Sequence, residues 1–463
     1  MEKNKFQAPP GMRDILPQEE YFYQKIYSTA QKVLDFYGFE KIDTPIAEQA
    51  DLFSRGVGET TELIEKQMYS FRTKSKDLLA LRPEGTVPIM RAYLQHGMFA
   101  WPQPIKFWYF GPFFRYERPQ AGHYREFRQF GVEVLGERSP IADAQIILIL
   151  SAILNELGLK NIAFKVNSVG DANCRPVYKK ALMNFLKNKK NELCSDCQQR
   201  LKINPLRILD CKNAKCRQIL ADAPQIINYL CPECHEHFKE VLEILDEIKI
   251  NYTLDPYLVR GFDYYTNTVF EVEMIEEKKE AVIEVKDEAE KAEKTEDTTE
   301  AEKAEQPAGE KEKKDKEEEI QLGSLAGGGR YDRLAKSLGG PEIPACGWGV
   351  GVERLIEAMK RKKIKPSGQS PQVFLAQIGV LAKRKTLKLM EDFRKERIKV
   401  SESIGRDSLK NQLDRAGRLG AKYALILGQK EALDGEIIIR DMENGQQTTV
   451  DQEDIIKEVK KRL

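Results

Sequence analysis

The chain has 463 residues, enough for two or three domains, and its 74 basic and 73 acidic side chains nearly balance. The balance hides an acidic tract at residues 276–319, whose 19 acidic and 10 basic side chains leave a net charge of about +10 on the remainder. No apolar run approaches the roughly 18 residues that span a bilayer, and the N-terminus lacks the apolar core of a signal peptide. These features exclude a membrane span and predict a cytoplasmic protein whose basic body suits a polyanionic partner.

The first part of the chain predicts a helix followed by a large hairpin. Residues 1–10 are expected to form a flexible tail. Apolar residues recur at helical spacing over Tyr21–Tyr37, which predicts an amphipathic helix that ends before Gly38. The stretch Trp101–Leu135 alternates aromatic and β-branched residues around a break at 119–122, which predicts two long strands joined by a loop.

The middle of the chain predicts a helix over Ile141–Leu157 and a short strand over Phe164–Val169. Residues 171–247 carry helical patterns punctuated by cysteine pairs, which predicts a helical, Cys-rich insertion. The next stretch, Leu258–Phe270, has a β-like pattern. The acidic tract at 276–319 has no aromatic residue and cannot bury enough apolar surface to fold, so we expect a disordered insertion there.

The C-terminal part, residues 371–463, follows a linker and alternates strands with helices, which predicts a compact α/β domain. We expect strands at Val373–Val380, Tyr423–Leu427 and Glu436–Arg440, and helices at Lys385–Arg397, Leu409–Leu419 and Glu453–Leu463.

The predicted hairpin carries the first group of candidate functional residues. On its second strand Gln129, Gly131 and Glu133 share one face, with the glycine leaving room for a small polar ligand. Arg115 and Arg118 on the first strand offer forked donors that suit phosphate. The alternative for such an Arg- and Glu-rich hairpin is an antiparallel pair with exposed ion pairs.

Four shorter motifs supply further candidates. A turn before Thr86 presents that hydroxyl beside Glu84, a pair that could hold an ammonium group. VRGFDYY places Arg260 beside two tyrosines, and AGGGRYD allows close backbone approach to a ligand or forms a plain loop. GVGVERL places Arg354 near the start of a helix, where anions bind, although an ordinary surface arginine is the alternative.

In this order these motifs resemble the histidyl-tRNA synthetases, a family of class II aminoacyl-tRNA synthetases. The first predicted helix with GFEKIDTP resembles the first class motif, FRYERPQAGHYREFRQFGVEV the second and GVGVERL the third. VRGFDYY and AGGGRYD resemble the two signatures of the histidine enzymes. The resemblance runs from Gly11 to the C-terminus, except for the acidic tract.

The resemblance implies an α+β catalytic domain at 11–365, an antiparallel sheet flanked by helices, and a C-terminal α/β anticodon-binding domain at 371–463. It also implies a homodimer that activates L-histidine with ATP and Mg²⁺, giving histidyl-adenylate and pyrophosphate. The histidyl group then passes to the 3′ end of tRNA(His). The alternatives are a catalytically inactive synthetase-like regulator that binds histidine or tRNA, and a general RNA-binding protein. The retained motifs favour the enzyme.

The same resemblance assigns roles to individual side chains. Arg260 and Arg115 are the catalytic residues, and Gln120 would meet the tRNA acceptor end. Histidine would be bound by Glu84, Gly85, Thr86, Gln129, Glu133, Tyr264 and Tyr265, and ATP by Arg115, Arg260 and Arg354. The chain departs from the family at Ala121 and His123, where basic residues are usual.

The cysteines leave two possibilities open. Six of them form three close pairs within the predicted insertion, and two of the pairs have the Cys-x2-Cys spacing of a structural zinc site. One possibility is a structural zinc ion held by Cys194, Cys197, Cys231 and Cys234. The other, equally open, is that the cysteines are reduced thiols in a helical insertion. Cys174 and Cys346 are expected to be ordinary buried residues.

Overall fold

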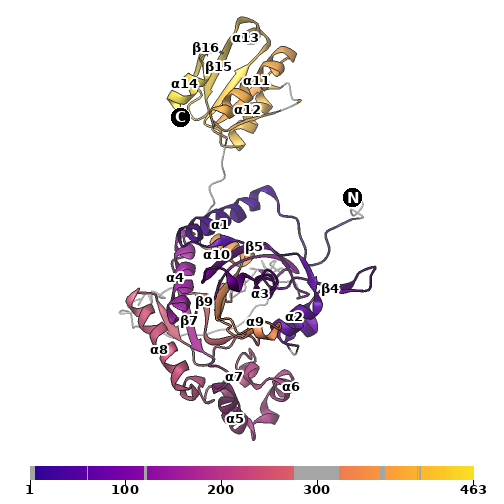
Figure 1. Cartoon of the computed structure of the whole chain (residues 1–463). Coiled ribbons are helices and arrows are strands. Elements are labelled where there is room, and N and C mark those ends of the chain that lie inside the picture. The colour runs from indigo at the N-terminus through magenta and orange to yellow at the C-terminus, as the bar shows by residue number, and fades with distance from the viewer. Residues whose placement is uncertain are drawn as a thin grey trace, which may run out of the picture. The chain divides into compact units, whose positions relative to one another are not determined.

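The computed structural model describes residues 6–59, 61–118, 122–275, 323–364, 371–403, 405 and 408–463. The chain divides into two compact units, Met1–Lys365 and Pro366–Leu463 (Figure 1). Residues 6–10 of the predicted tail are exposed and form no helix or strand. Residues 1–5 and the predicted acidic insertion at 276–319 lie outside the described residues.

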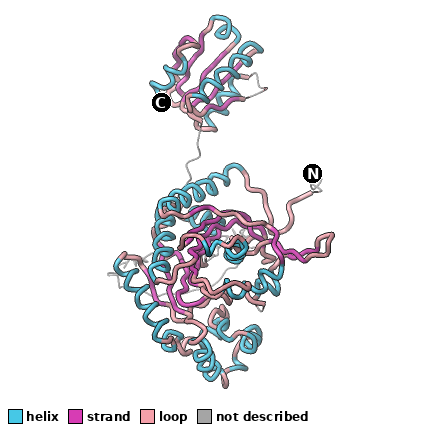
Figure 2. Tube along the Cα trace, in the orientation of Figure 1, coloured by secondary structure: helices cyan, strands magenta, loops and turns pink. Residues whose placement is uncertain are grey.

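An eight-stranded sheet organises the first unit, with helices packed around it (Figure 2). Every neighbouring pair of strands is antiparallel except the outermost pair at each edge. In spatial order the strands are β1 (Glu40–Lys41), β5 (Ile105–Phe114), β6 (Glu126–Leu135), β11 (Ala345–Gly351), β10 (Ala326–Arg330), β9 (Thr266–Met274), β7 (Ile162–Ser168) and β8 (Tyr252–Leu254). The predicted hairpin is confirmed as the antiparallel pair β5 and β6.

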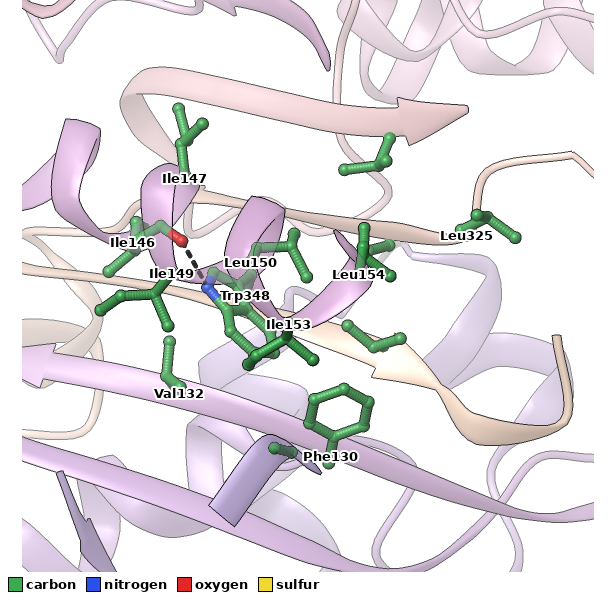
Figure 3. Packing of buried hydrophobic residues seen from close by; sticks show 14 of the residues in the cluster. Phe130, Val132, Ile146, Ile147, Ile149, Leu150, Ile153, Leu154, Leu325 and Trp348 are labelled. Atoms are coloured by element: carbon green, nitrogen blue, oxygen red, sulfur yellow. Dashed lines mark hydrogen bonds between the residues drawn. The ribbon is translucent and has the colours of Figure 1, made fainter. Parts of the chain in front are cut away.

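The main core lies between this sheet and four helices. These are α1 (Pro17–Phe36), α4 (Pro140–Glu156), α8 (Pro232–Glu247) and α10 (Val352–Arg361). Ten of the seventeen α4 residues are buried, so protein surrounds this helix on most sides. Trp348 on β11 packs against α4, and its indole N–H donates to the Ile146 carbonyl at 2.8 Å (Figure 3). Apolar burial contributes about 25 cal/mol per Å² to such a core, and the hydrogen bond satisfies the buried indole.

A second core lies beneath a three-stranded sheet with the order β2, β4, β3. The elements of this layer are β2 (Ala47–Gln49), α2 (Ala50–Val57), the short helix η1 (Leu63–Gln67), β3 (Ser70–Arg72), β4 (Leu78–Leu81), α3 (Thr86–Gln95), η2 (Met98–Ala100) and α9 (Leu334–Ser337). The second core also takes buried residues from β5 and from the Cys-rich insertion. This layer matters for the site because the turn between β4 and α3 carries Glu84.

The predicted Cys-rich insertion is helical. It contains α5 (Cys174–Leu186), η3 (Lys190–Glu192), α6 (Ser195–Ile203), η4 (Pro205–Ile208), α7 (Ala214–Leu220) and η5 (Ile226–Tyr229), followed by α8. Helix α8 packs through Phe238, Val241 and Leu245 into the main core. The chain therefore returns to the sheet before residue 247.

One prediction about local structure is wrong in part, and one open alternative is settled. The stretch Leu258–Tyr265 forms turns and loop, and strand β9 begins only at Thr266. The glycine run that could have been a plain loop is the buried strand β10. A side chain at Gly328 would lie 2.6 Å from the Trp348 Cβ atom, so only glycine permits this strand to pack here.

The second unit is an α/β domain, as predicted, and its sheet has five strands where the sequence predicted three. Its strands are, in spatial order, β13 (Val400–Glu402), β12 (Val373–Gln377), β14 (Tyr423–Leu427), β15 (Glu436–Asp441) and β16 (Gln447–Asp451). The helices are α11 (Val380–Lys395), α12 (Leu409–Arg418), α13 (Gln429–Asp434) and α14 (Ile455–Arg462). The short elements β13, α13 and β16 were not predicted, because their few residues carry too little periodic signal.

Candidate active site

The hairpin of β5 and β6 forms one wall of the candidate site. Gln129 on β6 donates a hydrogen bond from Nε2 to the Tyr109 hydroxyl at 2.6 Å. The register places Tyr109 opposite Gly131, and a Cβ atom on this glycine would lie 2.5 Å from the tyrosine oxygen. Gly131 therefore makes room for Tyr109 and not, as predicted, for a ligand.

Glu84 lies in the turn before α3 and binds the first residues of that helix. Its two carboxylate oxygens accept hydrogen bonds from the backbone N–H groups of Thr86 at 2.9 Å and Val87 at 2.8 Å. Burial raises the pKa of the Glu84 carboxyl to about 7. A side chain at Gly85 would lie 2.6 Å from a ring atom of Tyr109, so glycine lets the turn approach the hairpin. The predicted ammonium-binding carboxylate thus also satisfies the first two backbone N–H groups of α3, whose N-cap residue is Gly85.

Glu133 lies behind Thr86 and is fully buried. One carboxylate oxygen accepts a hydrogen bond from the Thr86 hydroxyl at 2.7 Å, and the other accepts one from the Tyr331 hydroxyl. Burial raises the pKa of the Glu133 carboxyl to about 8, and the nearby Glu84 adds to this effect. The predicted face of β6 does bring Gln129 and Glu133 to one region, but Glu133 contacts protein hydroxyls.

Three tyrosines pack beside these carboxyl groups. The ring centroids of Tyr264 and Tyr265 are 4.6 Å apart, and those of Tyr264 and Tyr331 are 5.6 Å apart. Burial raises the pKa of Tyr264 and of Tyr331 well above the ordinary value. Both hydroxyls therefore keep their protons and can donate hydrogen bonds.

Arg260 projects from the loop before β9 and lies over the glycine strand β10. Its guanidinium forms an ion pair with Glu271 on β9. A Cβ atom on Gly327 would lie 2.5 Å from the guanidinium carbon, so the glycine makes space for this side chain. The buried Arg260 Nε has no hydrogen-bond partner within the described part of the chain. The arginine therefore keeps donor capacity for a ligand.

Arg115 and Arg354 complete the cationic part of the site. Arg115 donates from Nε to the Pro83 carbonyl at 2.9 Å. Arg354 lies in the first turn of α10, donates to the Ser324 carbonyl at 2.6 Å, and has its Nη2 atom 3.1 Å from His123 Nε2. Burial lowers the pKa of Arg354, and the positive charge of Arg115 adds to this effect. The positive charges of Arg115 and Arg354 repel each other, and an anion bound between them would offset this repulsion.

These side chains border one cavity of about 1130 Å³. The predicted site residues that line it are Glu84, Thr86, Arg115, Gln129, Arg260, Tyr264, Tyr265 and Arg354. Glu133 and Gly85 lie outside this lining, and Gln120 lies outside the described residues. The cavity combines a buried carboxyl group and hydroxyls with three guanidinium groups. It can therefore hold an amino group and a chain of phosphates together.

Known proteins are similar to this chain over nearly all of its length. The sequence model of the histidyl-tRNA synthetase family matches residues 11–282 of the chain. The chain belongs to the histidyl-tRNA synthetase family. The histidine–tRNA ligases of Caldanaerobacter subterraneus subsp. tengcongensis and Halothermothrix orenii are 38% and 40% identical to it, each over 98% of this chain and 99% of their own length.

The second unit and the solved structures agree with this membership. The sequence model of the anticodon binding domain family matches residues 372–462 of the chain. The crystal structure of apo S. aureus histidyl-tRNA synthetase is 32% identical, covers 98% of this chain and 100% of that chain, and has a TM-score of 0.76. The predicted family and its two-part fold are thereby confirmed. Among the described residues, no helix is long and apolar enough to cross a membrane.

Sequence reasoning missed four residues of this histidyl-tRNA synthetase site. Tyr109 and Tyr331 bind Gln129 and Glu133, as described above. Glu271 pairs with Arg260, and His123 lies between Arg354 and Glu117, whose carboxylate is 3.0 Å from His123 Nδ1. The signal for Tyr109 was its place opposite Gly131 in the hairpin. Tyr331 and His123 depend on contacts with residues 198 and 231 positions away, and Glu271 on a contact between a loop and a strand 11 positions apart, none of which a periodic pattern reveals.

The structure also regroups the cysteines. Cys194 and Cys197 cluster with Cys211 and Cys216, whereas Cys231 and Cys234 cluster with Cys174 and Asp171. A single site made of Cys194, Cys197, Cys231 and Cys234 is therefore wrong, because its two pairs belong to different clusters. Cys174 is buried, as expected, but it is also a member of the second cluster. Cys346 is buried on β11.

Proposed function

We propose that the chain is a histidine–tRNA ligase. It joins L-histidine to ATP, giving histidyl-adenylate and pyrophosphate, and then transfers the histidyl group to the 3′ end of tRNA(His). The observation that carries this proposal is the single cavity in which Glu84 and Gln129 lie together with Arg115, Arg260 and Arg354. The full-length similarity to histidine–tRNA ligases supports the same activity.

Histidine binds at the carboxyl and hydroxyl end of the cavity. Glu84, with Thr86 and Gln129, holds the α-amino group, since an ammonium ion beside the buried carboxyl favours its charged form. Tyr264 and Tyr265 contact the imidazole. Glu133 does not contact the ligand but positions the pocket, because its carboxylate accepts hydrogen bonds from the hydroxyls of Thr86 and Tyr331. A pocket that pairs each polar atom of its ligand rejects analogues that lack one.

ATP binds at the cationic end. Arg115 contacts the α-phosphate, Arg354 contacts the γ-phosphate, and Arg260 approaches the α-phosphate from the histidine side. The cavity wall also carries Glu117 and Glu271, and carboxylate oxygens are the ligands that Mg²⁺ takes. Mg²⁺, when bound, would neutralise phosphate charge beside them.

Adenylate formation requires position and charge more than proton transfer. The histidine carboxylate attacks the α-phosphorus, the bond to the β-phosphate oxygen breaks, and pyrophosphate leaves. Negative charge grows on the phosphate oxygens during this step. Arg115 and Arg260 act as the catalytic residues because their fixed positive charges lie where that charge develops.

The remaining partners follow from the domains. The catalytic domain spans residues 11–365, and the C-terminal domain at 371–463 binds the anticodon of tRNA(His). Gln120, which follows β5 and precedes β6 in the sequence, meets the acceptor end. We further propose that the enzyme is a cytoplasmic homodimer, in keeping with the first class motif in the sequence.

The test is histidine-dependent exchange of labelled pyrophosphate into ATP, which requires no tRNA. Wild-type protein should catalyse exchange with histidine and with no other amino acid. Arg260→Ala should lose it, whereas Arg55→Ala, a substitution at an exposed arginine paired with Asp51 on α2, should not. A folded wild-type chain that binds histidine or tRNA but gives no exchange with Mg²⁺ and ATP would establish the inactive regulator instead.

A further inference from the structure

Four cysteines of the helical insertion meet at one place, although they come from three separate elements. Cys194 and Cys197 lie at the start of α6, Cys211 lies in the loop before α7, and Cys216 lies in the first turn of α7. All their sulfur atoms lie within 4.8 Å of one another. None of them forms a disulfide.

The sulfur positions suit a tetrahedral metal ion. Zinc lies about 2.3 Å from each thiolate, which places neighbouring sulfurs of a four-thiolate site about 3.8 Å apart. The distance between the Sγ atoms of Cys194 and Cys211 is 3.8 Å. The backbone N–H of Cys194 donates to Cys216 Sγ at 3.2 Å, and such a bond stabilises a thiolate ligand.

The surrounding fold gives a reason for a metal. Helices α6 and α7 have only nine and seven residues, too few to be stable in water by themselves. Each buries two residues, and in each helix one of the two is a cysteine of the cluster. Both helices also bury a leucine, Leu201 and Leu220, in the second core, and a metal ion held by the cysteines would link the two helices directly.

We propose that Cys194, Cys197, Cys211 and Cys216 bind one Zn²⁺ as a closed structural site. Four thiolates fill the coordination of the ion, which leaves no open position for catalysis. The cluster of Asp171, Cys174, Cys231 and Cys234 differs in its donors, since Asp171 already accepts hydrogen bonds from the N–H groups of Asn173 and Cys174 at the start of α5.

The zinc site acts on the active site through the segment between its ligands. Within that segment Asn204 donates to the Asp263 carboxylate at 2.9 Å, and Arg207 donates to the Gly261 carbonyl. These two contacts hold the loop that carries Arg260. Zinc therefore positions this loop, and its loss should weaken histidine activation; this part rests on the proposed function.

The experiment measures zinc in the full-length protein, purified under reducing conditions, by elemental analysis. Cys216→Ser should hold about one Zn²⁺ fewer than wild type, and Cys234→Ser serves as the matched substitution in the other cluster. Co²⁺ in place of zinc should give thiolate charge-transfer absorption typical of four sulfur ligands in wild type and in Cys234→Ser. That four-sulfur spectrum should be absent in Cys216→Ser.

A conservative pair of variants separates metal binding from folding. Cys211→His should keep the ion, because three cysteines and one histidine also form a common zinc set, whereas Cys211→Ser should lose it. Wild type that takes up no Zn²⁺, or a folded Cys216→Ser with undiminished zinc, would overturn the proposal. Bound zinc without pyrophosphate exchange would leave the site standing and refute only the proposed activity.

Discussion

Glu133 should make the stability of the catalytic unit depend on pH. Its carboxyl group is fully buried, and burial raises its pKa from an ordinary value of 4.5 to about 8. Between these two values the folded chain holds a proton that the unfolded chain has released. Stability therefore falls as the pH rises through this range, and the group contributes most at acidic pH.

The size of the effect follows from the two pKa values. A tenfold difference in proton affinity is worth about 1.4 kcal/mol, so Glu133 should remove about 3 to 4 kcal/mol of stability between roughly pH 5 and pH 8. Glu133→Gln cannot ionise, yet its amide oxygen can still accept from Tyr331 and its amide N–H can face the Thr86 hydroxyl. The free energy of unfolding of the variant, relative to that of wild type, should therefore increase by this amount as the pH rises from about 5 to about 8.

Urea unfolding followed by tryptophan fluorescence measures this difference. The three tryptophans, Trp101, Trp108 and Trp348, all lie in the first compact unit, so the signal reports that unit alone. Comparing Glu133→Gln with wild type cancels the shared groups that do not interact with Glu133, and the double variant with Glu84→Gln measures the part that Glu84 contributes. Glu243→Gln on α8, whose glutamate side chain is 63% exposed, is the control and should parallel wild type. Parallel curves for Glu133→Gln and wild type would refute the reasoning.

Two further substitutions test the packing of the site and of the core. Gly327→Ala should displace the Arg260 guanidinium and lower pyrophosphate exchange by roughly 100-fold with little change in unfolding midpoint, because misplacement by about 1 Å is enough for such a loss; unchanged exchange would mean that the arginine can shift freely. Arg330→Met should cost about 3–5 kcal/mol in urea unfolding, since it leaves the buried Asp143 carboxylate without its arginine partner, whose Nη2 atom lies 2.5 Å from Asp143 Oδ2, and with only His237 beside it among the described residues. Arg55→Met on α2 should cost less than about 1 kcal/mol because its ion pair is exposed, and equal costs for the two would contradict this account.

Much of the fold could be predicted because its signals are local. Helices α1 and α4 follow from apolar spacing, and the β5–β6 hairpin from alternation around a proline and glycine break. The alternation also placed Gln129 and Glu133 on one face. The contact of Glu133 with Tyr331 could not be predicted in this way, since 198 residues separate the two.

The cysteines illustrate the same limit. In the sequence the three pairs are nearly evenly spaced, so spacing alone gives no reason to join one pair with another. The path of the chain decides the grouping. Cys231 donates its backbone N–H to the sulfur of Cys174, a residue 57 positions earlier, and is thereby drawn away from Cys194 and Cys197.

The glycines of β10 and β11 explain why local rules failed at the centre of the site. Glycine disfavours strands, so a glycine run indicates a loop when only its neighbours in sequence are considered. Here the glycines form the floor beneath functional side chains. A Cβ atom on Gly347 would lie 2.9 Å from the Glu133 carboxyl carbon, and one on Gly349 would lie 3.2 Å from the Gln129 amide carbon. The residues that weaken the strand signal are thus the ones that the site requires, because bulk at these positions would expel the side chains above them.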